Sequence, residues 1–123
     1  MGNFDLKKFV KIFVIFILID LIWIKIVAKP KYSKMILNIQ GEPMKVKMVP
    51  AFLVYVFMTV LLMLFGSQSN TRNFLLGSLT YGVYDFTNLA IFNKFDKVFA
   101  LFDALWGGVL FTLVNKINLE LNF

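Results

Sequence analysis

Four apolar runs, each close to the length that a helix needs to cross a bilayer, occupy most of this chain. They extend over about residues 9–28, 49–65, 74–92 and 98–114. A helix of about 20 apolar residues spans the hydrocarbon core of a membrane. The last two connections, GSQSNTR and NKFDK, are short, and short connections make consecutive helices antiparallel neighbours. The pattern predicts one all-α domain over residues 1–123, an integral membrane four-helix up-and-down bundle with several membrane crossings.

The composition favours the same class and excludes others. Hydrophobic residues make up 59% of the chain and charged residues 16%, whereas soluble domains carry about 25% charged residues. The net charge of +6 comes from bases that flank the apolar runs, a pattern typical of anchoring at anionic membrane surfaces. We therefore expect the lipid bilayer, and not nucleic acid, as a partner. Without histidine or cysteine the chain lacks the commonest transition-metal ligands, so no metal site is expected.

The connection between the first two runs has a helical pattern of its own. Its apolar residues are spaced i, i+3, i+4 and i+7, with lysines on the opposite face. These apolar residues are Tyr32, Met35, Ile36 and Ile39. Pro30 suits the first turn of a helix and Gly41 suits its end. We expect a short amphipathic helix over about residues 30–41 that lies in the membrane interface. A lysine-rich loop in solution is the alternative.

Three aspartates interrupt the apolar runs, and helix geometry places them at one depth. Counted at 1.5 Å per residue, Asp20, Asp85 and Asp103 all lie on the order of 8–12 Å from the surface formed by the first and third connections. Tyr55 falls at the same depth. The nearest base, Lys25, lies roughly 140° around the helix from Asp20 and can reach the surface. At neutral pH we therefore expect at least one carboxyl group to carry a proton, or a cation to lie among them.

The sequence Asp-x-x-Trp occurs twice, as DLIW in the first run and DALW in the fourth. The spacing i, i+3 puts Asp20 with Trp23, and Asp103 with Trp106, on one helix face. Each indole N–H can then donate to a carboxylate of its own or of a neighbouring helix. Because the two helices run in opposite directions, the repetition also fits an inverted repeat, an architecture that places binding sites between its halves.

The polar residues near the acids also admit a purely structural role. Asn88 follows Asp85 by three residues and shares its helix face. Inside membranes such side chains often form interhelical hydrogen bonds worth about 0.6 kcal/mol each. This is the alternative to a binding role for Asn88 and Tyr55. For intramembrane acids without a base, a functional site is the default hypothesis.

The ordered motifs ILIDLIWI, YDFTNLAI and DALWGGVL resemble the bacterial and viral four-helix membrane proteins grouped as domain of unknown function 2177. The resemblance covers nearly the whole chain and implies the same fold, but no activity. It implies signature positions at Asp20, Trp23, Tyr32, Tyr84, Asp85, Thr87, Asn88, Asp103, Trp106 and Gly107.

Together these patterns favour a buried carboxylate layer that binds or relays a proton or small cation. Four helices barely enclose a pathway, so a channel or transporter needs a second copy, and we expect a homo-oligomer. One alternative is a binder or enzyme of a lipid or isoprenoid-like molecule, with the acids as general acid and base. Another is a membrane or viral envelope scaffold without transport activity. The sequence identifies no cofactor. The candidate ligand- or ion-binding residues are Asp20, Asp85, Asp103, Asn88, Tyr55, Tyr84, Trp23 and Trp106.

Overall fold

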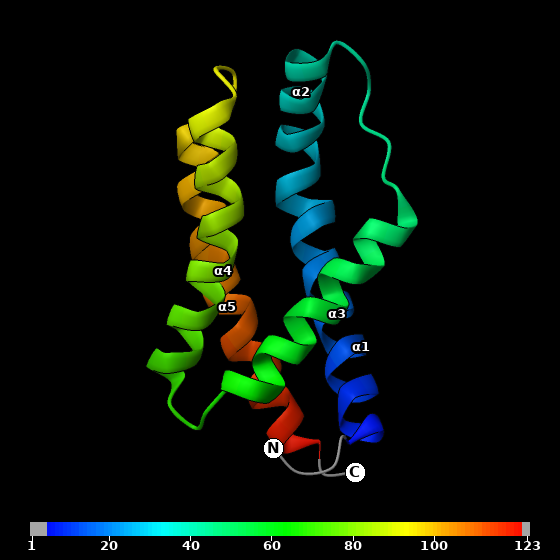
Figure 1. The fold of residues 1–123 in the computed structure, drawn as a ribbon, viewed down its shortest axis with the longest axis vertical. Coiled ribbons are helices and arrows are strands. Elements are labelled where there is room, and N and C mark those ends of the chain that lie inside the picture. The colour runs from blue at the N-terminus through cyan, green and yellow to red at the C-terminus, as the bar shows by residue number, and fades with distance from the viewer. Residues whose placement is uncertain (1–4, 122–123) are drawn as a thin grey trace.

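The computed structural model describes residues 5–121, which form helices and short connections (Figure 1). The helical segments are α1 (Leu6–Trp23), the π-helix η1 (Ile24–Ala28), α2 (Lys29–Gln40), α3 (Met48–Phe65), α4 (Asn70–Ile91) and α5 (Lys97–Glu120). The first three follow one another without a break and make one long rod. With α3, α4 and α5 the described residues form four helical rods and no strand, so the predicted all-α four-helix fold is confirmed.

The first rod differs in one respect from the expected elements. The predicted helix near residues 30–41 exists, and Gly41 ends it with a φ of 75°. It is not a separate helix lying across the end of the bundle, because it continues the axis of α1 (Figure 1). In η1 the N–H of Lys29 donates to the carbonyl of Ile24, five residues back. A wide turn suits Pro30, which has no N–H and whose ring would collide with a carbonyl in a regular α-helix.

The π-helical turn also keeps one face of the rod directed inward. Eight residues of regular α-helix would rotate Ala28 by about 80° from Asp20, and one extra residue in a π turn removes most of that offset. Accordingly, Asp20, Ala28 and Met35 are all buried. The predicted inward face of α2 is confirmed, with Met35 buried and the other three side chains partly buried. Those three are Tyr32, Ile36 and Ile39.

The antiparallel helices α4 and α5 pack closely through glycines. Gly77 on α4 and Gly107 on α5 lie so near each other that a Cβ atom on either would collide with the other's backbone carbonyl. Gly108 lies against Phe74 in the same way. Small residues of this kind allow close approach of helix backbones inside membranes. The pair therefore forms the most closely packed part of the bundle.

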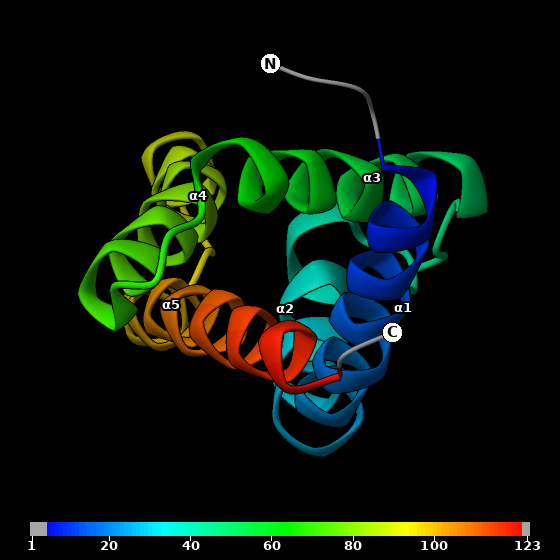
Figure 2. The same ribbon diagram turned by 90° about the horizontal axis from the view of Figure 1, so that it is seen from below.

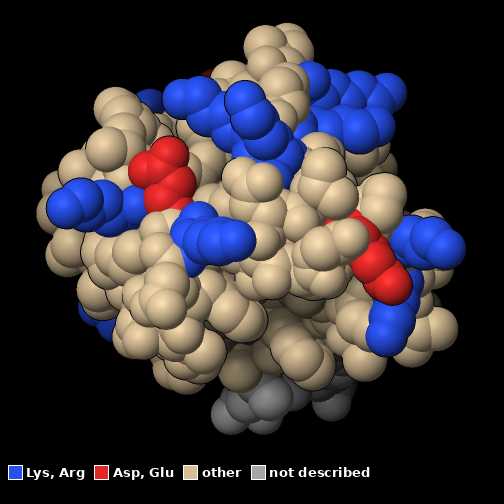
Figure 3. Space-filling model, turned by 90° about the horizontal axis from the view of Figure 1, so that it is seen from above, with Lys and Arg blue, Asp and Glu red and all other residues tan. Residues whose placement is uncertain are grey.

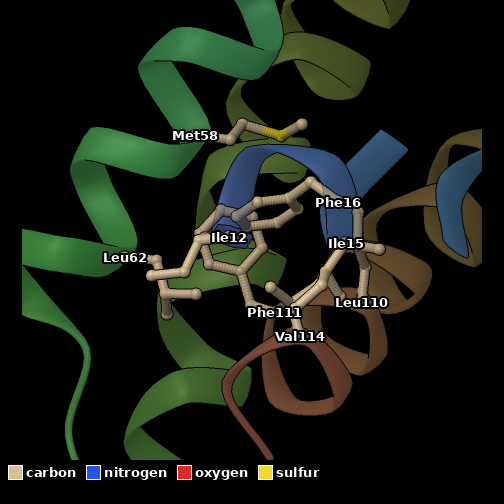
Figure 4. Close-up of a cluster of buried hydrophobic side chains, with 8 residues drawn as sticks. All are labelled: Ile12, Ile15, Phe16, Met58, Leu62, Leu110, Phe111 and Val114. Atoms are coloured by element: carbon tan, nitrogen blue, oxygen red, sulfur yellow. The ribbon is translucent and has the colours of Figure 1, made fainter. Parts of the chain in front are cut away.

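Helix α3 crosses the other rods obliquely, as Figures 1 and 2 show. Its C-terminal half joins α1 and α5 in a hydrophobic core near the chain termini (Figure 4). The core residues are Ile12, Ile15, Phe16, Met58, Leu62, Leu110, Phe111 and Val114. Toward its N-terminus α3 leaves this core, and it contacts α4 at only a few positions. The half of the bundle near α2 is therefore less completely filled.

The outer faces of the rods carry large apolar side chains, as expected for contact with lipid. Examples are Leu18, Phe57, Leu79 and Phe102, one from each of α1, α3, α4 and α5, and each more than half exposed. Within residues 5–121, α3 and α5 are long and apolar enough to cross a membrane by length and composition. The predicted runs in α1 and α4 do not meet that criterion, because α1 carries three lysines and an aspartate and α4 carries a polar stripe.

The contact between α4 and α5 yields a matched pair of glycine substitutions. We expect Gly77→Ala to destabilise the protein by about 1–3 kcal/mol, because its Cβ has no space between the helices. Gly82→Ala meets only Ala104, at 3.9 Å, and should be neutral or stabilise the helix by up to about 1 kcal/mol. Thermal unfolding in detergent compares the two variants. Equal effects of both would show that α4 and α5 are not packed as described.

Candidate functional site

The two Asp-x-x-Trp motifs meet between α1 and α5 and exchange hydrogen bonds. The indole N–H of Trp23 donates to Oδ1 of Asp103 at 3.1 Å, and that of Trp106 donates to Oδ1 of Asp20 at 3.0 Å. The two indoles stack with their ring centroids 4.8 Å apart and their planes 5° from parallel. Each motif therefore satisfies the carboxyl group of the other motif, through a geometry that antiparallel helices make possible.

Asp20 joins all four rods of the bundle. Besides Trp106 of α5, it accepts a hydrogen bond from the hydroxyl of Tyr55 in α3, at 2.6 Å to Oδ2. The hydroxyl of Tyr81 in α4 donates to Oδ1 at 3.4 Å. The side chain is buried, and the three donors replace many of the hydrogen bonds to water that its carboxylate loses. Asp20 is therefore a fully hydrogen-bonded acceptor without a basic partner in the described part of the chain.

Asp85 has a different environment. It is completely buried in the α4–α5 pair beside Asp103, and neither of its carboxyl oxygens has a well-formed hydrogen bond. An ionised carboxylate would be costly there, so the neutral acid, which can offer its proton to Asp103, fits the site better. Among residues 5–121 no three acidic side chains lie close enough together to hold a metal ion. The acids are thus neighbours that do not share one coordination centre.

The remaining candidates from the sequence lie outside this network. The hydroxyl of Tyr84 lies against that of Tyr32 in α2, and the Tyr84 side chain is half exposed. Asn88 lies one turn further along α4, beside Tyr84. The structure therefore brings five of the predicted residues into one network of hydrogen bonds and stacked indoles, with Asp85 next to it and Tyr84 and Asn88 apart from it. The five are Asp20, Trp23, Tyr55, Asp103 and Trp106.

A cavity of about 700 Å³ lies beside the network, where α3 diverges from α4. Asp20, Trp23, Tyr81 and Asp103 line its polar part. Much of the remaining wall is apolar and comes from α1, η1, α3 and α5. It includes Leu21, Ile24, Val54, Phe57, Leu61 and Phe99. A volume of several hundred Å³ with a few convergent polar groups is typical of small-molecule sites.

Sequence reasoning left Tyr81, Lys25 and Lys29 out of the candidate site, although all three line the cavity. Tyr81 had a usable signal, because it precedes Asp85 by one helical turn on the polar face of α4. Lys25 is exposed, in keeping with its predicted position around the helix from Asp20, and it borders the cavity as well.

The stacked indoles give a spectroscopic test of the network, since they are the two tryptophans of the chain. We expect Trp23→Phe and Trp106→Phe each to abolish an exciton couplet in circular dichroism. Each should also lower the free energy of unfolding by about 1–3 kcal/mol, because a buried carboxyl oxygen loses its donor. The exposed Phe102→Leu is the control and should change neither quantity. A couplet that survives either tryptophan substitution would contradict the stacked arrangement.

Comparison with known proteins gives one match. A protein-family model described as predicted membrane protein (DUF2177) matches residues 5–119, which include every residue of the network and cavity. Neither the comparison with curated proteins nor that with solved structures found a match. The resemblance inferred from the motifs is therefore confirmed. This membrane protein belongs to the DUF2177 family, domain of unknown function 2177.

Proposed function

We propose that this protein binds an amphiphilic molecule, a lipid or an isoprenoid-like compound, in the cavity between α1, α3 and α4. The lining of the cavity supports this proposal. Apolar side chains from several helices form most of its wall, and hydrogen-bonded aspartates, tyrosines and an indole form the rest. Such a site suits a ligand that has an apolar chain and a polar head.

The position of α3 supports entry from the bilayer. Val54 and Phe57 line the cavity, yet 51% and 61% of their surfaces are exposed. These side chains therefore border both the cavity and the outer surface of the bundle. Because α3 contacts α4 at only a few positions, an acyl or prenyl chain can pass between these helices without entering water.

The relay of a proton or small cation, expected from the sequence, is a second candidate. In its favour, Asp85 lies buried beside Asp103, and a pair of acids can hold and exchange a proton. Against it, the core below the network contains the fully buried Phe16, Leu110 and Phe111, which offer no polar path toward the termini. Within one copy, Asp103 of this pair lines the cavity, so a proton passed to it from the buried Asp85 would be available to a molecule bound there, as from a general acid.

The scaffold hypothesis accounts for the network but not for the space beside it. Hydrogen bonds to Asp20 from three other rods would hold a bundle together with no ligand at all. A scaffold does not need a cavity of this size, because side chains packed into the same space would add stabilising contacts between the helices. The cavity is thus the feature that favours binding over a structural role.

Filling the cavity should therefore remove the ligand. Val54→Phe adds volume to the cavity wall, whereas Val60→Phe makes the same change on α3 outside the cavity. After extraction into detergent, native mass spectrometry should find a bound lipid-like molecule on the unmodified protein and on Val60→Phe. Val54→Phe should retain roughly fivefold less, as a loss of about 1 kcal/mol implies. Equal retention by both variants, or no retention by the unmodified protein, would contradict the proposal.

A further inference from the structure

Two lysines belong to the wall of the cavity, and the carboxylate network does not account for them. They are Lys25 in η1 and Lys29 at the start of α2. No ion pair to either lysine is described within residues 5–121. The carboxylate of Asp20 is already occupied by hydroxyl and indole donors. A cationic amine beside an apolar cavity needs an anion or water as a partner.

We infer that the molecule bound in the cavity carries a phosphate head group, and that Lys25 and Lys29 hold it at the mouth of the cavity. This inference rests on the proposed function, and it specifies the chemical class of the ligand. A lysine amine binds phosphate as a compact point charge. Basic pockets between membrane helices are known places for phosphate-bearing lipid heads.

The depth of the two lysines fits this assignment. They follow Asp20 by five and nine residues, which along a helix is roughly 7–14 Å nearer to the end of the bundle that carries α2. That end lies at the top of Figure 1, and Figure 3 shows many basic and few acidic side chains on it. Phosphates of a bilayer lie at its surface, while the acids lie deeper. A lipid with its phosphate at the lysines can therefore place its chain against α3.

Neighbouring side chains complete the phosphate site. Tyr32 of α2 and Tyr84 of α4 also line the cavity, and their hydroxyl groups meet across it. One hydroxyl proton is used in the hydrogen bond between them, and the other can donate to a phosphate oxygen. Asp20 and Asp103 would repel a phosphate placed beside them, so the anion belongs near the lysines and not in the carboxylate layer.

The test uses the two tryptophans of the chain, because Trp23 lines the cavity and Trp106 stacks on it. Brominated acyl chains quench indole fluorescence on contact, so they report occupation of the cavity. The purified protein in detergent micelles is titrated with brominated phosphatidic acid, phosphatidylcholine and diacylglycerol. We expect phosphatidic acid to quench at a roughly tenfold lower mole fraction than diacylglycerol, with phosphatidylcholine between them.

The matched control comes from the same rod. Lys31 and Lys34 of α2 are exposed, as Lys25 and Lys29 are, but they do not line the cavity. The double variant Lys25→Gln, Lys29→Gln should lose the preference for phosphatidic acid, whereas Lys31→Gln, Lys34→Gln should keep it. The circular dichroism couplet of the stacked indoles shows that each variant is folded.

Each contrary outcome has a distinct meaning. Equal loss of preference in both lysine variants would overturn the inference, because general surface charge would explain it. Saturable quenching without a head-group preference would overturn the phosphate site and leave the proposed function standing. No saturable quenching by any lipid would contradict the proposed function itself. If the phosphate site holds, competition between polyprenyl phosphate and unbrominated phosphatidic acid identifies which lipid phosphate binds more tightly.

Discussion

Buried carboxyl groups without a basic partner are the constraint on which the arrangement of this bundle depends. Asp20 can stay buried only because donors reach it from α3, α4 and α5 together. Asp103 likewise needs the indole of Trp23 on α1. Displacing any one rod would leave an acid with fewer partners in apolar surroundings. The network thereby fixes the relative positions of helices whose mostly apolar surfaces specify little on their own.

The network also lies between two halves of the bundle that differ in how completely side chains fill them. On the side of the termini, α1, α3 and α5 fill the interior with close-packed apolar side chains. On the side of α2, the oblique course of α3 leaves a cavity, and Lys25 of η1 is part of its wall. The proposed ligand would have packed apolar side chains below it and lipid beside it. The acids would then contribute both to the stability of the bundle and to binding.

Some features of the structure could be predicted from the sequence, and others could not. The apolar runs predicted the rods, and rise per residue predicted that Asp20, Asp85 and Asp103 would be neighbours. Spacing alone could not predict whether each indole N–H would donate to the aspartate of its own helix or to that of the other helix. Pro30 does lie in the first turn of α2, but the π-helical turn that joins α2 to α1 has no sequence pattern of its own and could not be predicted. The cavity could not be foreseen, since α3 is apolar on every side and its sequence does not determine its tilt.

We propose that the cavity beside the buried acids holds a lipid. An experimental density map of the protein in a lipid nanodisc tests this most directly. We expect elongated density along α3, with a compact head near Lys25 and Lys29 and the indoles of Trp23 and Trp106 still stacked. A map in which α3 closes against α4 and side chains fill the space would contradict it.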